Sequence, residues 1–281
     1  AVTKMQKLTV IGLNSERTAF LHELMRLGVV EINSQEGVVN DEEWMPDIFR
    51  TSNSADVSRL EADIARVSVA LEAINQHDGS KKPLFATRKE IRRNAFVDHM
   101  NATKTATERN VDRAVEAQRV ITEAQTEINR LKTIMTGLTP WEKLDVPLDM
   151  TETVFSCVIL GIVGMKVNLA QLQTEVLAAV PSAVIEEVGS DKQQRYLCFL
   201  CLKEEKDALY EALRAFSFSP VTLAGEKGTP ADQIQHAQRE IVSLEENIRK
   251  QEAVLAELSS GKNDIEFLYD SLCMRRDRAK V

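Results

Sequence analysis

The last fifty residues carry a stripe of apolar side chains at alternating spacings of three and four, and this pattern constrains the fold most strongly. All but Gln251 and Lys262 of its members can pack against a neighbouring helix. A seven-residue repeat keeps one narrow helix face turned toward a partner helix, so it predicts a coiled coil. The stripe consists of Ile234, Ala237, Ile241, Leu244, Ile248, Gln251, Leu255, Leu258, Lys262, Ile265, Tyr269 and Leu272.

A second stripe of the same spacing lies far upstream, in a helix predicted from about residue 88 to residue 137. Thr87 and Glu90 form a capping box at its start, and Gly137 ends it. The final helix, starting at Thr229, has about the same length, so the two helices are expected to pair as an antiparallel hairpin. The upstream stripe consists of Ala114, Ala117, Ile121, Ala124, Ile128, Leu131 and Met135.

Both stripes lose their apolar character at the same height of this hairpin. In the register that equal helix lengths suggest, Lys262 faces Thr107 and Ser259 faces Asn110. Gly261 adds a helix penalty of about 1 kcal/mol. We therefore predict a soft or bent point at these residues, with a simple helix break as the alternative.

The segment between the two stripes reads as strand, helix, strand, strand, helix, strand. This βαββαβ order is that of the ferredoxin-like plan, in which four strands and two helices make a self-sufficient core. The expected strands are Thr153–Ile162, Ala183–Val188, Arg195–Leu202 and Val221–Leu223, and the expected helices are Leu169–Val180 and Glu205–Phe216.

The first fifty residues read as strand Lys7–Leu13, helix Glu16–Leu27 and strand Val29–Ile32, with Ser15 as the helix cap and Gly28 ending the helix. So short a segment cannot bury enough apolar surface to fold alone. We expect an incomplete lobe that needs further strands from elsewhere.

The predicted fold class is α+β. It comprises a long antiparallel two-helix coiled-coil stalk, a ferredoxin-like distal lobe at its tip and an incomplete α/β proximal lobe at its base. The expected domains are the proximal lobe, the first stalk helices with a break near 77–87, the distal lobe and the returning stalk helix. They span residues 1–53, 54–137, 138–228 and 229–281.

Composition argues against two classes of partner. A net charge of −8, without a large basic cluster before the basic end of the last helix, disfavours nucleic acid. The longest apolar run, Val154–Val163, is shorter than the roughly 20 residues that span a bilayer. No signal peptide is evident, and the chain is expected to be soluble.

No pattern indicates catalysis, and we expect neither a cofactor nor a metal. The sequence lacks a GxxxxGK[ST] loop. Cys198 and Cys201 have CxxC spacing, but residues three apart on a strand face opposite sides of a sheet, so they are expected to be buried structural thiols. Gly161 and Gly164 are best explained by a turn after a strand. Trp141, next to Pro140, is either a buried plug at the hinge or an anchor for a partner.

Three segments resemble subunit I, also called subunit a, of V-type and archaeal-type rotary ATPases. They are the opening Met5–Leu13 with its helix, the strand-like Leu27–Ile32 and the loop Lys81–Phe85. The order of lobe, long helix, ferredoxin-like lobe and returning helix is also similar to that family. The resemblance covers essentially the whole chain.

The resemblance implies a non-catalytic stator component of a proton- or sodium-translocating complex, on the cytoplasmic face of the membrane. Its implied partners are the peripheral-stalk subunits E and G and its own membrane domain, which this sequence does not contain. The proton path belongs to that membrane domain, so no proton-path residue is carried over. The family's continuation after the second long helix is expected to complete the proximal lobe.

Two other readings remain open. A coiled-coil scaffold with a ligand-sensing ferredoxin-like lobe would use glycine-rich strand ends to bind a small molecule. A hinge protein of the structural-maintenance-of-chromosomes type would need a nucleotide-binding loop in residues 1–50 and a basic surface, and the sequence has neither.

Overall fold

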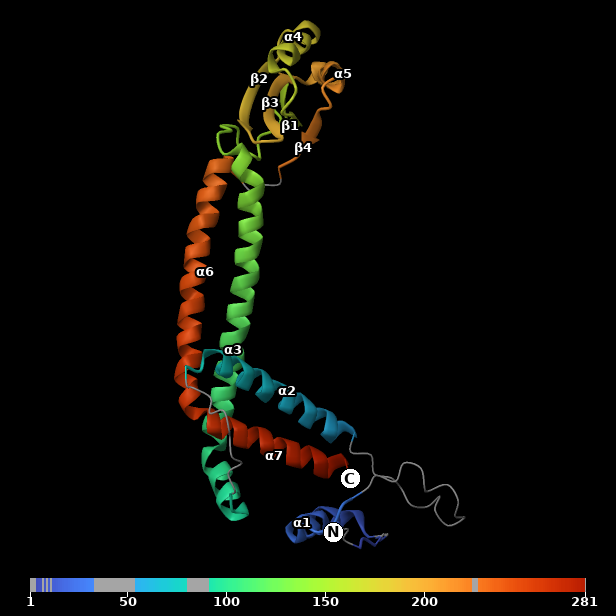
Figure 1. The fold of residues 1–281 in the computed structure, drawn as a ribbon, viewed down its shortest axis with the longest axis vertical. Coiled ribbons are helices and arrows are strands. Elements are labelled where there is room, and N and C mark those ends of the chain that lie inside the picture. The colour runs from blue at the N-terminus through green and yellow to red at the C-terminus, as the bar shows by residue number, and fades with distance from the viewer. Residues whose placement is uncertain are drawn as a thin grey trace, which may run out of the picture. The chain divides into compact units, whose positions relative to one another are not determined.

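The computed structural model describes residues 4–6, 8, 10, 12–32, 54–79, 91–223 and 227–280 (Figure 1). The chain divides into two compact units. One contains Ala1–Gln118 and Glu252–Val281, and the other contains Arg119–Gln251. The long helices α3 (Arg93–Leu138) and α6 (Pro230–Leu258) contribute to both units.

The second unit contains a four-stranded sheet in the order β2-β3-β1-β4, and every neighbouring pair is antiparallel. Along the chain the elements follow the expected βαββαβ order. The strands are β1 (Ser156–Gly164), β2 (Val184–Ser190), β3 (Gln194–Leu202) and β4 (Ser219–Val221), and the helices are α4 (Leu169–Ala179) and α5 (Lys206–Arg214).

Both helices of the lobe cover the same face of its sheet, where they enclose the larger of two apolar cores. Alternate residues of β1 and β3 point into this core because side chains alternate across a strand. Its fully buried members include Leu172 of α4, Leu209 and Leu213 of α5, and Leu197 and Phe199 of β3.

The other face of the sheet holds a second, smaller core beside the short 3-10 helix η2 (Thr139–Trp141). Trp141 packs edge-on against Tyr196 with ring centroids 5.3 Å apart, and Leu160 and Val188 complete the contact. A Cβ atom at Gly189 of β2 would lie 2.6 Å from the carbonyl oxygen of Pro140. Glycine therefore lets η2 approach the strand closely.

Most strand boundaries in the lobe differ from the prediction by one to three residues. β1 begins at Ser156 rather than Thr153, because the Thr153 backbone N–H donates to the Ser156 carbonyl at 2.8 Å and closes a turn. β4 spans Ser219–Val221 rather than Val221–Leu223. The 3-10 helix η3 (Lys203–Glu205), which precedes α5, is a further difference.

The helix α6 begins as the sequence predicted. Its cap is reciprocal: the Asp232 backbone N–H donates to the Thr229 hydroxyl at 3.2 Å, and the Thr229 N–H donates to the Asp232 carboxylate at 3.1 Å. Pro230 occupies the first helical position, where its missing N–H costs nothing.

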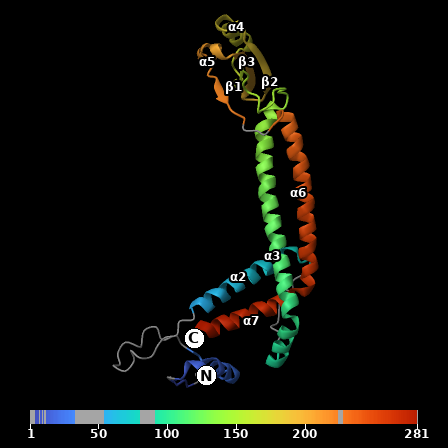
Figure 2. The same ribbon diagram turned by 180° about the vertical axis from the view of Figure 1, so that it is seen from behind.

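The regular elements described in the first unit are all helices. It contains the 3-10 helix η1 (Asn14–Glu16), α1 (Arg17–Leu27), α2 (Ser54–His77), the first part of α3 and the end of α6. The 3-10 helix η4 (Ser259–Gly261) and α7 (Lys262–Lys280) complete it. α2 and α7 lie side by side (Figure 2) and bury apolar residues such as Val67, Ile74 and Ile265.

The two strands predicted near the N-terminus are wrong for the residues that the structure describes. The described part of 7–13 and residues 29–32 have no strand, and Leu8, Val10 and Val29 are largely exposed. A strand needs a partner edge for its backbone hydrogen bonds, and the described part of residues 4–32 provides none. The predicted helix is present, although Ser15 lies inside η1 and does not cap it. Gly28 ends it with a left-handed φ of 64°.

The start of α3 also differs from the prediction. Ile91 and Arg92 are not helical, and the helix begins at Arg93 and runs for 46 residues. The predicted capping residues Thr87 and Glu90 lie outside the described residues, as does most of the break expected near 77–87. Among the described helices, none combines the length and the apolar character that crossing a membrane requires.

Candidate functional site

The helix faces predicted to form the coiled-coil seam are turned away from solvent in both units. In the second unit, Ala124, Ile128 and Leu131 of α3 are buried, while Ile121 and Met135 are half-buried. Figures 1 and 2 show this part of α3 running beside α6. On α6, Ile234 and Ala237 are buried, and Ile241, Leu244, Ile248 and Gln251 are half-buried.

The first unit contains the remaining seam positions. Ala114 and Ala117 of α3 and Leu255 and Leu258 of α6 are buried. Past η4, Ile265 and Leu272 are buried and Tyr269 is half-buried, but α7 packs mainly beside α2 rather than continuing the predicted pairing with α3. Among the described residues, no predicted seam position is exposed.

The register between α3 and the end of α6 lies within about two residues of the predicted one. Arg113 Nη2 and Glu257 Oε2 form an ion pair at 3.5 Å. A Cβ atom at Gly261 would lie 3.6 Å from Asn110 Nδ2, so Asn110 faces Gly261 rather than Ser259. Opposite charges across the seam favour this antiparallel pairing.

The structure places a break in the helix at the predicted bend. α6 ends at Leu258, the three residues of η4 follow, and α7 begins at Lys262. On α3, the buried Thr107 hydroxyl donates to the Thr103 carbonyl at 3.0 Å. Hydrogen bonds of this kind, back to the preceding turn, often bend a helix.

Polar and aromatic contacts surround the break. Lys262 reaches Asp78, just beyond α2, with an Nζ–Oδ2 distance of 3.4 Å, and both side chains are largely shielded. His99 Nε2 lies 2.8 Å from Asp264 Oδ1, and its ring packs edge-on against Phe267. The sequence placed Lys262 on the seam but gave no sign of Asp78, because that contact joins residues far apart in the chain.

The sequence allowed two roles for Trp141, a buried plug or an anchor for a partner, and in the structure the side chain is buried. Only 2% of the residue is exposed, and it belongs to the core beneath the sheet. A side chain enclosed in this way contributes to packing and offers no surface to a partner in this structure.

The cysteines of the lobe are buried, and Cys198 and Cys201 point into different cores, as strand alternation requires. Burial raises the pKa of the Cys198 thiol to about 11 and that of Cys201 to about 12. The fold instead places Cys201 opposite Cys157 on β1, with the two sulfur atoms 3.6 Å apart. Raised thiol pKa values disfavour the reactive thiolate.

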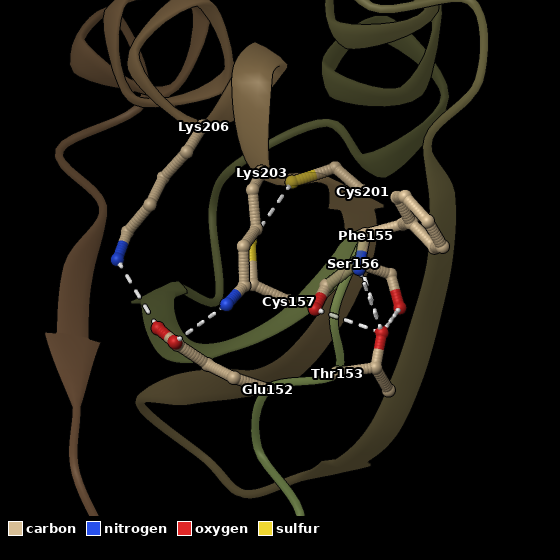
Figure 3. A network of polar contacts seen from close by, with 8 residues as sticks. All are labelled: Glu152, Thr153, Phe155, Ser156, Cys157, Cys201, Lys203 and Lys206. Atoms are coloured by element: carbon tan, nitrogen blue, oxygen red, sulfur yellow. Dashed lines mark hydrogen bonds and ion pairs between the residues drawn. The ribbon is translucent and has the colours of Figure 1, made fainter.

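A polar network holds the turn that leads into β1 (Figure 3). Glu152 pairs with Lys203 at 3.1 Å and with Lys206 at 3.9 Å. The hydrogen bond from Lys203, reinforced by the charges of both lysines, lowers the pKa of Glu152. The Thr153 hydroxyl accepts from the backbone N–H groups of Phe155 and Ser156 at 3.3 and 3.0 Å.

A recess of about 690 Å³ in the first unit is lined by residues of α1, α2, α3 and α7. Its lining includes Leu60 and Leu272 together with basic and acidic side chains such as Arg59 and Asp63. Within the described residues, no group of three or more His, Cys, Asp or Glu side chains could hold a metal ion.

These features define a class of protein: a mixed helix-and-sheet chain whose long paired helices offer packing surfaces. No protein-family model matches the chain. A curated relative, the A-type ATP synthase subunit I of Methanothermobacter thermautotrophicus, is 23% identical across 99% of this chain. The chain spans 44% of that relative's length.

A solved structure shares the fold. It is the crystal structure of the cytoplasmic N-terminal domain of subunit I, homolog of subunit a, of V-ATPase, which matches with a TM-score of 0.54 at 17% identity. The match covers 96% of this chain and 85% of that domain. The resemblance to subunit I suggested by the opening residues is therefore confirmed.

Proposed function

We propose that this chain is the cytoplasmic arm of a stator subunit in a V/A-type rotary ATPase. The observation that carries this proposal is the similarity to an A-type ATP synthase subunit I along nearly the whole chain, together with the fold shared with a subunit I domain. A stator arm must hold other parts at a fixed distance, and helices of this length suit that task. At 1.5 Å per residue, α3 alone is roughly 70 Å long.

The arm comprises a long antiparallel coiled coil, a distal lobe of ferredoxin-like plan and an incomplete proximal lobe formed by the N-terminal residues. The four-stranded antiparallel sheet with two helices on one face supports the identity of the distal lobe. The shielded seam positions on α3 and α6 support the coiled coil. The exposed apolar residues around α1 support a lobe that needs further chain to be complete.

The mechanism is mechanical rather than catalytic. Torque from the rotor is resisted by the paired helices, whose buried seam stiffens them along their length. The break at η4 adds lateral compliance without disconnecting the two ends. Its shielded Lys262–Asp78 pair keeps the local geometry defined while the helix direction changes.

The partners of this arm are the peripheral-stalk subunits E and G and its own membrane domain, and it works at the cytoplasmic face of the membrane. The complex moves protons or sodium ions through that membrane domain. The arm itself needs no cofactor, because its task is to transmit force.

A binding experiment tests this function. The full chain is immobilised and challenged with purified stalk heterodimer E–G, beside a variant lacking residues 141–228 whose helical content is checked by circular dichroism. Binding by the full chain that weakens in the deletion variant supports the stator arm and its distal interface. Absence of binding by the folded full chain contradicts it.

A further inference from the structure

Two large apolar side chains occupy the tip of the turn that leads into β1. Val154 and Phe155 are 79% and 76% exposed. Tight turns of this kind usually carry Gly, Asn, Asp or Ser, whose backbone or side chain suits the turn. Exposing apolar surface to water is unfavourable, so their presence indicates a contact outside the lobe.

The turn is held rigidly in place. The Thr153 hydroxyl binds two backbone N–H groups inside the turn, and Glu152 is tied to Lys203 and Lys206 on the other side (Figure 3). Figure 3 also shows the Phe155 ring pointing away from this network. A preorganised aromatic side chain loses little conformational entropy on binding, and this favours affinity.

Apolar side chains are also exposed on the adjoining sheet, where the Lys203 backbone N–H, just after β3, donates to the Phe155 carbonyl at 2.9 Å. Leu200 and Leu202 alternate with Phe199 and Cys201 on β3, so they lie on the face that α4 and α5 do not cover. Val184 of β2 pairs with Leu200. Val184 is 59% exposed, Leu200 is 41% exposed and Leu202 is 44% exposed. We call the five residues the tip surface: Val154, Phe155, Val184, Leu200 and Leu202.

The architecture and the charge of the lobe indicate what covers this surface. A sheet face is normally packed against a second layer, and the opposite face of this sheet is packed by helices. Residues 142–228 contain thirteen Asp and Glu against eight Lys and Arg.

The charged side chains beside the tip surface include two lysines and three glutamates. Lys203 and Lys206 are already paired with Glu152. In the described part of the chain, Glu186 and Glu204 have no ion-pair partner. An acidic rim around an apolar face complements a helix that carries an aliphatic stripe flanked by Lys and Arg.

We propose that the tip surface is the docking site for a basic amphipathic helix of a partner subunit. This inference rests on the proposed stator function, because that function supplies the helical partner. Phe155 is the central anchor of the contact, and Leu200 and Leu202 form its floor. Glu186 and Glu204 lie at the rim and select a basic partner.

The test measures the affinity of the full chain for purified E–G heterodimer by calorimetry. Phe155→Asp is expected to raise the Kd at least about tenfold, as is typical of a lost aromatic anchor. The control is Leu177→Asp, which puts the same charge at an apolar site on α4 that is 43% exposed and lies on the helix-covered side. A double change, Glu186→Lys with Glu204→Lys, is expected to weaken binding and to reduce its dependence on salt.

Phe155 is exposed, so its replacement should leave the lobe folded, and circular dichroism verifies this. Weaker binding by Phe155→Asp with an unchanged Leu177→Asp supports the docking site. If wild type binds and Phe155→Asp binds equally well, or if both variants weaken alike, the docking site is overturned while the stator function stands. Absence of binding by wild type overturns both.

Discussion

The sheet lobe and the N-terminal helix α1 differ in how completely they bury their own apolar side chains. The lobe encloses one core beneath α4 and α5 and another beneath η2. Around α1, Phe20, Leu27, Val29 and Val30 are exposed, and among the side chains that the structure describes there, Leu21 alone is buried. Similar residue types therefore have different roles: in the lobe they hold a fold together, whereas around α1 they form a surface that can be covered only by something else.

The largest effect is expected when the Trp141 side chain is removed from the core under the sheet. Trp141→Ala leaves a cavity between η2 and β3, so the free energy of unfolding should fall by about 3–5 kcal/mol. Urea unfolding followed by circular dichroism measures the loss. The matched change around α1 is Val30→Ala, where an exposed side chain should contribute less than about 0.5 kcal/mol. Similar losses in both variants would contradict the distinction between the two regions.

Much of the lobe could be predicted from its sequence, because its signals are local. Strand alternation around Phe199 and the asparagine cap of α4 each depend on neighbours in the chain. The turn predicted at Gly161 is wrong, because Gly161 lies inside β1, where a Cβ atom would meet the Phe218 ring. Asn168 does cap α4, accepting from the backbone N–H groups of Ala170 and Gln171. The opposite facing of Cys198 and Cys201 likewise followed from period-two geometry.

The features that the sequence hid depend on distant residues or on a misplaced boundary. The Lys262–Asp78 contact joins elements separated by most of the chain. The tip surface was missed because Val154 and Phe155 were assigned to a strand. Thr153 and Ser156, which flank them, are the signal that could have revealed a turn. Near the N-terminus, apolar alternation predicted strands, but alternation cannot supply the partner edge on which a strand depends.

Replacing two glycines by alanine provides a test of intermediate size. The free energy of unfolding is expected to fall in one variant and to rise in the other. At Gly189 in the lobe a new Cβ would meet the Pro140 carbonyl oxygen at 2.6 Å, so Gly189→Ala should cost about 1–3 kcal/mol. At Gly261 in the helical unit the nearest atom is Asn110 Nδ2 at 3.6 Å, an ordinary contact. Gly261→Ala should therefore stabilise by about 0.5–1 kcal/mol through helix propensity.

The same Gly261 variant tests the bend. Electron microscopy of the assembled complex should show a narrower range of arm bending in Gly261→Ala than in wild type. Changing Lys262 as well, for example to Leu, would also stiffen the seam, but it removes the contact with Asp78 and so mixes two effects. An unchanged bending range in Gly261→Ala would count against compliance at η4.

The smallest expected effect concerns an exposed carboxylate of the lobe. Asp191, in the turn between β2 and β3, accepts from the backbone N–H groups of Gln193 and Gln194 and from the Tyr196 hydroxyl. These hydrogen bonds, the one from Gln193 first, lower the pKa of Asp191 below its usual value of 3.8. The pKa of Asp191 is lower in the folded chain than in the unfolded chain, so its carboxylate stabilises the fold above about pH 3.8. This contribution is lost as pH falls through the folded pKa.

The Tm of Asp191→Ala should accordingly lie below that of wild type between pH 5 and 8, and the difference should shrink below about pH 3.8. The comparison around α1 is Glu23→Ala, which removes exposed ion pairs with Arg26 and His22 and should leave Tm almost unchanged. A Tm difference for Asp191→Ala that stays constant down to pH 2 would show that its carboxylate charge adds nothing. The turn would then depend on packing alone, and the lobe would differ from α1 in its apolar cores but not in its polar contacts.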